Sequence, residues 1–219
     1  MSSLLSRLRR RLEHGLAMQE VLDRLARRGC TFYPYIVFAE AAGIEKDELR
    51  LTQACEIREL TEDDIAGIAS IPERPRGKAV LRERFRRGHV GIGAFDAGAI
   101  VAYTWCDLER FTAFGRGTVL RLLEPDEAYL YDAYTRPDYR GRSLVPILRS
   151  EVYRVMRARG RQRLYSVSLY FNRSARRFKA KLNARELELR LWINLFDKFT
   201  RDFRLKRSPG RSAVASNSN

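Results

Sequence analysis

Apolar residues recur at two different spacings along this chain, and each spacing predicts one type of secondary structure. Over residues 4–28 the leucines return every three or four positions, which predicts an amphipathic helix with an arginine-rich polar face. Over residues 184–196 apolar and polar side chains alternate, which predicts a strand. The chain therefore combines helices and strands.

The same two patterns, bounded by turn residues, predict the other elements. Residues 31–43 are aromatic and β-branched but contain Pro34, which predicts an edge strand or an extended linker. The sequence Asp96-Ala97-Gly98 predicts the turn of a hairpin. Further strands are expected at 54–60, 89–95, 99–108, 127–135 and 163–171, and further helices at 61–71, 76–88, 143–160 and 172–183.

The order of these elements predicts an α/β fold with a mixed sheet. An antiparallel meander lies in the middle of the chain and crossover helices follow it. The strands 127–135 and 163–171 should be parallel neighbours joined by a right-handed crossover. We expect a basic helical segment at 1–29, an extended connector at 30–52, a folded domain at 53–207 and a disordered tail at 208–219.

The net charge of the chain says more about its partners than the rest of its composition does. The 219 residues include 42 Lys and Arg against 27 Asp and Glu, a formal net charge of +15, which favours anionic partners. The three cysteines are widely separated and the two histidines are isolated, so we expect no metal site. No signal peptide or membrane span is evident, which predicts a cytoplasmic protein. The N-terminal helix could lie on an anionic membrane, but the pattern favours packing on its own domain.

The sequence between the strand 127–135 and the next helix has the composition of an anion-binding turn. Gly141 allows the backbone to approach a ligand closely, and Arg140 and Arg142 add positive charge. The helix that begins near Ser143 offers unpaired N–H groups and the positive end of its dipole. Together these features predict a phosphate site.

Three segments carry a family resemblance: "TRPDYRGRSL" at this turn, "NRSARRFKAKLNAREL" at the next strand-to-helix unit, and "CEIRELTEDDIAGI" near residue 55. Over roughly residues 53–196 the chain resembles the GCN5-related N-acetyltransferases (GNAT). The resemblance implies the GNAT fold with an N-terminal helical extension, and acetyl-CoA or another acyl-CoA as co-substrate. It also implies these cofactor-binding residues: Tyr134, Thr135, Arg140, Gly141, Arg142, Ser143, Leu144, Asn172, Ser174 and Lys179.

The chain departs from the family pattern at a few positions. Ser143 and Val145 stand where the family usually has glycine and glycine or alanine. Asn183 and Ala184 replace a Gly-Phe ending. Lys179 stands where a tyrosine often serves as the general acid, so the proton donor for the departing thiolate has to come from elsewhere.

The strand "EAYLYDAYT" supplies the candidate catalytic groups. Asp132 is the candidate general base, because a carboxylate between tyrosines in mid-strand needs a reason, although a paired or edge-exposed acid explains it equally well. Glu127 is the other acid of this strand. Tyr134 is a candidate proton donor, with ordinary strand packing as the alternative.

These observations predict an N-acyltransferase that moves an acyl group, acetyl in the simplest case, from acyl-CoA to an amine. The basic segments 70–80 and 108–119 suggest an acceptor that carries an acid group or a sugar phosphate. Two alternatives stay open: an acidic acyl carrier protein as donor, or a non-catalytic module that binds an anionic membrane or nucleic acid. Nucleic acid ranks last, because no platform of interleaved aromatic and basic residues is evident.

Overall fold

The computed structural model describes residues 16–40, 55–72, 74, 76–112, 119–141 and 144–208. The chain divides into two compact units. The first consists of residues 1–39 and 167–219, and the second of residues 40–166. Parts of three predicted segments lie outside the described residues. They are residues 4–15 of the predicted N-terminal helix, residues 41–52 of the predicted connector 30–52, and residues 209–219 of the predicted tail.

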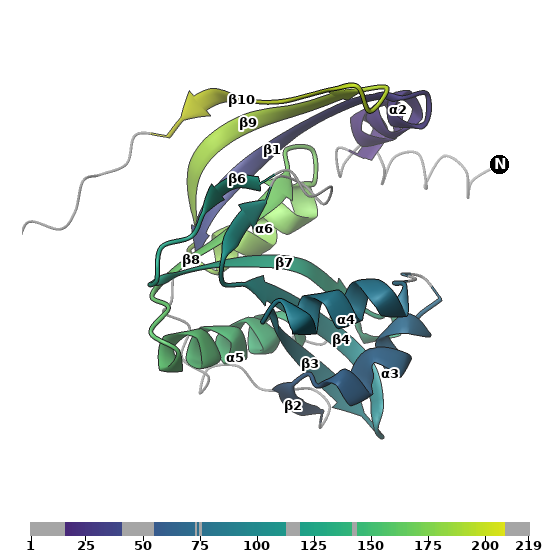
Figure 1. Ribbon diagram of the computed structural model, residues 1–219, viewed down its shortest axis with the longest axis vertical. Helices are drawn as coiled ribbons and strands as arrows, with labels where there is room; N and C mark the ends of the chain where they lie inside the picture. Colours follow the sequence, from purple (N-terminus) through teal and green to yellow (C-terminus); the bar gives the residue numbers. More distant parts are fainter. Residues whose placement is uncertain are drawn as a thin grey trace, which may run out of the picture. The chain divides into compact units, whose positions relative to one another are not determined.

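The second unit contains a mixed sheet with the strand order β8-β7-β4-β3-β2 (Figure 1). The pairs β2–β3, β3–β4 and β4–β7 are antiparallel, whereas β7 and β8 are parallel, as predicted. A separate two-stranded sheet pairs β5 with β6. The strands are β2 (Glu56–Glu59), β3 (Val90–Asp96), β4 (Ala99–Asp107), β5 (Arg110–Thr112), β6 (Val119–Leu122), β7 (Glu127–Thr135) and β8 (Arg163–Leu169).

Helices cover the two faces of this sheet and enclose two apolar cores. The long helix α5 (Leu144–Ala158) packs on one face through Leu148, Val152 and Met156. On the other face, Ile68 and Leu81 form a core with Trp105. The helices of that face are η2 (Glu62–Asp64), α3 (Ile65–Ala69) and α4 (Lys78–Arg86), and the short η3 (Pro137–Tyr139) precedes α5.

Turn chemistry confirms the predicted hairpin in this unit and also explains how η2 begins. Ala97 and Gly98 both have positive φ angles, 47° and 78°, which is the geometry of a two-residue hairpin turn between β3 and β4. Before η2, the Asp64 carboxylate accepts a hydrogen bond from the Thr61 N–H at 2.8 Å, which completes a capping box.

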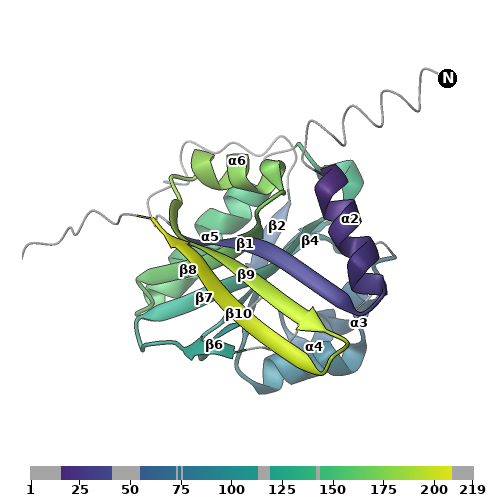
Figure 2. The same ribbon diagram turned by 90° about the horizontal axis from the view of Figure 1, so that it is seen from above.

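In the first unit, strands β1, β9 and β10 lie side by side (Figure 1 and Figure 2). Both pairs, β1–β9 and β9–β10, are antiparallel. The elements of this unit are α2 (Leu16–Arg27), β1 (Cys30–Glu40), α6 (Arg173–Lys181), β9 (Arg185–Leu195) and β10 (Phe199–Arg207).

One prediction for this unit needs correction, and one strand was missed. Pro34 predicted an edge strand or an extended linker, yet β1 pairs with β9 on one side and the Pro34 carbonyl accepts a hydrogen bond from the Tyr170 N–H on the other. N–H and C=O of one residue point to the same side of a strand, so the missing N–H of Pro34 leaves the ladder with β9 intact. The strand β10 was not predicted at all.

The helix α2 leaves apolar side chains in solvent. Met18 and Val21 are 50% and 48% exposed, whereas Asp23 of the same helix accepts a hydrogen bond from the Tyr33 hydroxyl of β1 at 3.2 Å. Among the residues that the structure describes, no helix is long and apolar enough to cross a membrane.

Candidate active site

A β-bulge in β7 shapes the centre of the second unit. Tyr131 pairs with Trp105 and Tyr134 with Tyr103, so two residues of β7 lie opposite the single residue Thr104 of β4. Asp132 is one of these two residues and has a φ angle of +48°, in the left-handed region that Asp tolerates better than most residues. Bulges re-aim side chains and are common beside active sites.

The re-aimed Asp132 carboxylate is held by three arginines that come from other elements. Arg74 lies in the loop after α3, Arg76 precedes α4, and Arg84 lies on α4. Their guanidinium nitrogens are 2.5, 2.9 and 2.7 Å from the Asp132 carboxylate oxygens. The Asp132 side chain is 4% exposed, so the carboxylate is almost completely removed from water.

These contacts fix the protonation state of Asp132. Burial alone raises the pKa of this carboxyl, but the hydrogen bond from Arg76 and the charges of Arg84 and Arg74 outweigh it and hold the pKa at about 2. A carboxylate with so low a pKa is a poor proton acceptor near neutral pH. Of the two interpretations that the sequence left open, the structure therefore favours the paired acid. Glu127 is likewise paired, with Arg121 and Arg163.

A narrow cavity lies between the bulged part of β7, β4 and the first turns of α5. Tyr134 and Thr135, both predicted to contact the cofactor, line it, and so does Val145. The complete lining consists of Tyr103, Thr104, Ala133, Tyr134, Thr135, Val145, Leu148 and Arg149. The Tyr103 and Tyr134 rings contact each other with their centroids 5.6 Å apart.

Two polar groups on the α5 side of this cavity are buried without a partner. The Thr104 hydroxyl and Nη1 of Arg149 have no hydrogen-bond partner among the described residues. Both residues are at most 6% exposed. Because unsatisfied buried polar groups are costly and rare, these two beside one cavity point to a ligand that carries hydrogen-bond acceptors. The Tyr103 side chain belongs to the core on the other face of the sheet, where its hydroxyl interacts with Arg76.

The turn between β7 and α5 lies next to this cavity and is held by several contacts. Tyr139 donates a hydrogen bond to Asp96 at 2.5 Å, and Nε of Arg140 donates to the Thr135 carbonyl at 3.2 Å. Gly141 has a φ angle of +79° and is exposed, as a close backbone approach requires. Arg142 and Ser143, the next two predicted contacts, lie outside the described residues.

The remaining predicted cofactor residues have other contacts. Leu144 packs in the apolar core under α5. Asn172, Ser174 and Lys179 belong to the first unit. Asn172 caps α6, since its side chain accepts a hydrogen bond from the Ala175 N–H at 3.0 Å. The Lys179 side chain lies over the Phe38 ring, 5.2 Å from its centroid.

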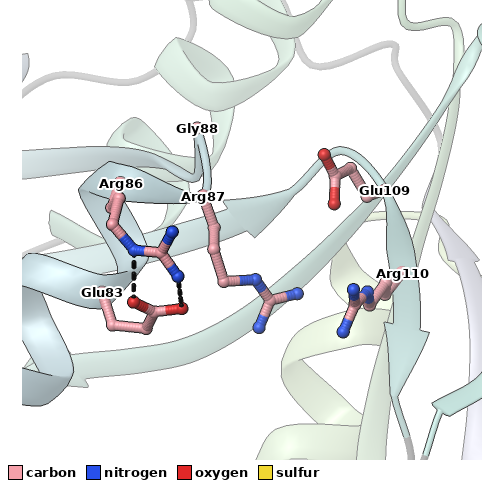
Figure 3. Close-up of a pocket in the computed structure, with 6 residues that line it drawn as sticks. All are labelled: Glu83, Arg86, Arg87, Gly88, Glu109 and Arg110. Atoms are coloured by element: carbon pink, nitrogen blue, oxygen red, sulfur yellow. Dashed lines mark hydrogen bonds and ion pairs between the residues drawn. The ribbon is translucent and has the colours of Figure 1, made fainter.

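A wider hollow lies at the C-terminal end of α4 (Figure 3). Its lining is Glu83, Arg86, Arg87, Gly88, Glu109 and Arg110. Arg86 donates two hydrogen bonds of 2.7 Å to Glu83, and the Arg87 side chain extends between this pair and Arg110 (Figure 3). Since every side chain of this lining is charged, the hollow suits a polar ligand and offers no apolar wall to an acyl chain.

Comparison with known proteins now decides the family. Residues 55–183, more than half of the chain, match the model of the acetyltransferase (GNAT) family. The chain is a member of the GNAT family. The resemblance expected from three sequence motifs is thus confirmed, and so is the expected fold. Membership supports an acyltransferase over a module without catalytic activity.

Solved structures of low sequence identity share this GNAT fold. A GNAT-family protein from Novosphingobium aromaticivorans is 21% identical, with a TM-score of 0.54 over 76% of this chain and 66% of the other. A protein of unknown function from Staphylococcus epidermidis is 10% identical, with a TM-score of 0.52 over 80% and 66%. The tandem GNAT protein from the clavulanic acid biosynthesis pathway is 12% identical, with a TM-score of 0.51 over 78% and 57%.

These likenesses concern the fold, because the identities are low and the chain spans about two thirds or less of the length of each of these proteins. No curated protein sequence matches the chain. Within the described residues, no group of three or more His, Cys, Asp or Glu side chains could hold a metal ion. The chemistry of this GNAT protein therefore has to be argued from its own site.

Sequence reasoning missed the arginines of this site as individual residues. Arg74 and Arg76 fall in the segment 70–80 that was noted as basic, but nothing in the sequence connects them to Asp132, which lies 58 and 56 positions further along. In the sequence, Arg84 is only one of several basic residues on a charged helix. The one signal that could have indicated the cluster was Asp132, a carboxylate in mid-strand that needs a positively charged partner.

Proposed function

We propose that this protein is an N-acyltransferase that moves an acyl group, acetyl in the simplest case, from acyl-CoA to an amine. The observation that carries the proposal is the narrow cavity beside the β7 bulge, with its two unpartnered polar groups. The thioester and amide carbonyls of an acyl-pantetheine arm are acceptors that the Thr104 and Arg149 donors fit.

The strand β7 provides further room for such an arm. It pairs with β8 only from Glu127 to Leu130, whereas it pairs with β4 up to Thr135. Backbone groups of its second half are proposed to bind the pantetheine, as the family pattern implies for Tyr134 and Thr135. The turn at Arg140 and Gly141, continuing into Arg142, Ser143 and the start of α5, would hold the pyrophosphate.

The reaction needs no redox partner. The amine nitrogen attacks the thioester carbonyl carbon, the carbon–sulfur bond breaks, and an amide and free CoA thiol are formed. The nitrogen loses one proton and the sulfur gains one. Tyr134 lines the cavity and is the proposed donor of the sulfur's proton, in place of the family's missing tyrosine. Asn172, Ser174 and Lys179 remain proposed cofactor contacts of the first unit.

Turnover is the direct test of this function. With acetyl-CoA and a panel of primary amines, the protein is expected to release CoA thiol at a rate that saturates with amine concentration. The measurement is colorimetric thiol detection, with mass spectrometry of the acylated amine as confirmation. Thiol release that is independent of every amine would mean hydrolysis, and no release above the uncatalysed rate would contradict the proposal.

A further inference from the structure

The arginines around Asp132 carry more positive charge than their carboxylate neutralises. Three guanidinium groups meet one carboxylate, which leaves an excess of two positive charges. The side chains of Arg74 and Arg76 are about one third exposed, at 35% and 34%, and that of Arg84 is 12% exposed. Each guanidinium carries five N–H donors, whereas the carboxylate accepts only about four hydrogen bonds in all, so the three arginines have spare binding capacity.

Unused donors in this cluster show where that capacity lies. Nε of Arg74 and Nη1 of Arg84 are buried and have no hydrogen-bond partner within the part of the chain that the structure describes. Arg84 is held in place by the rings of Trp105 and Tyr131, whose centroids lie 5.1 and 5.0 Å from its guanidinium carbon. A fixed, partly desolvated guanidinium with a free N–H suits an anion.

Tyr103 connects this cluster with the donor cavity. This residue lines the cavity, and the charges of Asp132, Arg74, Arg76 and Arg84 all act on its hydroxyl. Only Tyr103 would therefore separate an anion bound to the arginines from the proposed acyl group. Such a short separation suits an acceptor whose anionic group binds the arginines while its amine reaches the thioester.

We infer that Arg74, Arg76 and Arg84 bind the anionic group, a carboxylate or a phosphate, of the acceptor amine. The inference rests on the proposed acyl transfer and adds the substrate class to it. The wider hollow at Arg86 and Arg87 is a weaker candidate for this role, because Arg86 already donates two hydrogen bonds to the Glu83 carboxylate.

Matched acceptor pairs test this inference. Phenylalanine and phenethylamine differ by one carboxylate, and O-phosphoethanolamine and ethanolamine differ by one phosphate, so the two pairs also separate the two kinds of anion. In at least one pair, kcat/KM is expected to be tenfold or more higher for the anionic member, mainly through KM. Equal or better turnover of both neutral members would overturn the inference.

Variants separate anion binding from a purely structural salt bridge. In Arg76→Gln the preference within the favoured pair is expected to fall to near one, while the free energy of unfolding without anion falls only slightly, because Arg74 and Arg84 still pair with Asp132. The control is Arg82→Gln, an exposed arginine of α4, which should keep both the preference and the stability. Loss of stability in Arg76→Gln with an unchanged preference would show a structural role instead.

A binding measurement keeps this inference distinct from the proposed function. Inorganic phosphate is expected to raise the Tm of the wild-type protein and of Arg82→Gln, and to raise that of Arg76→Gln clearly less, at constant ionic strength. This result without any acyl transfer would uphold the anion site and refute the transferase. Acyl transfer with no anion preference and no effect of phosphate would do the reverse.

Discussion

Replacing Asp132 with alanine is expected to lower the free energy of unfolding by about 3–5 kcal/mol. The change removes the carboxylate that three guanidinium groups share and leaves like charges facing one another around a largely buried position. Urea denaturation followed by circular dichroism measures the loss, since urea adds no salt that would screen the charges.

The control for this prediction is another aspartate–arginine pair on the surface of the same unit. Asp138 is 53% exposed and pairs with Arg136 at 2.8 Å, so Asp138→Ala should cost at most about 1 kcal/mol. Adding Arg74→Gln to Asp132→Ala should recover part of the stability, because it removes one of the unpaired charges. A loss below about 1 kcal/mol in Asp132→Ala would contradict the account of this cluster.

The same carboxylate gives the protein a distinctive acid response. Its pKa is lowered from 3.8 to about 2 in the folded state, so the stability it contributes is complete above about pH 4 and is lost as the pH falls towards 2. The difference corresponds to roughly 2 kcal/mol. In Asp132→Asn this component of the pH dependence should be absent between pH 4 and pH 2.

Tyr134→Phe is expected to lower kcat about a hundredfold, because general acid catalysis contributes at least that factor in most enzymes that use it. The ring stays in place against Tyr103, so the KM for acetyl-CoA should change by no more than about twofold. Steady-state thiol release with the best amine of the panel measures both parameters.

A tyrosine on the same strand provides the matched control. Tyr129 is buried, packs against Phe111 and lines no part of the cavity, so Tyr129→Phe should retain its kcat. If Tyr134→Phe keeps kcat within about threefold of the wild-type value, the Tyr134 hydroxyl does not protonate the leaving sulfur. Another group would then have to supply this proton.

The sequence predicts most of the local structure because periodicity and turn chemistry are local signals. The hairpin at Asp96-Ala97-Gly98 and the parallel pair around α5 both depend on residues close together in the chain. The strand β10 escaped because its exposed face carries arginines among Phe199, Phe203 and Leu205, which blurs the alternation.

The site itself could be predicted only in part. The turn at Arg140 and Gly141 is a compact motif that the sequence displays directly. The bulge at Asp132 depends on how β7 pairs with β4, and the arginines that hold its carboxylate come from two segments more than 45 residues away in the chain. Such contacts depend on how distant segments pair in the fold. The sequence could therefore single out Asp132, but it could not show that Asp132 pairs with the three arginines.

The central claim is that the cavity beside the β7 bulge binds the acyl-CoA donor, and calorimetric titration with acetyl-CoA tests it most directly. Val145 lines the cavity, whereas Val80 is 52% exposed on α4, so Val145→Trp and Val80→Trp form a matched pair. The wild-type protein and Val80→Trp should show saturable binding of one acetyl-CoA per chain, and Val145→Trp at least tenfold weaker binding with an unchanged Tm. Absence of saturable binding to the wild-type protein, or equal affinity in Val145→Trp, would contradict the claim.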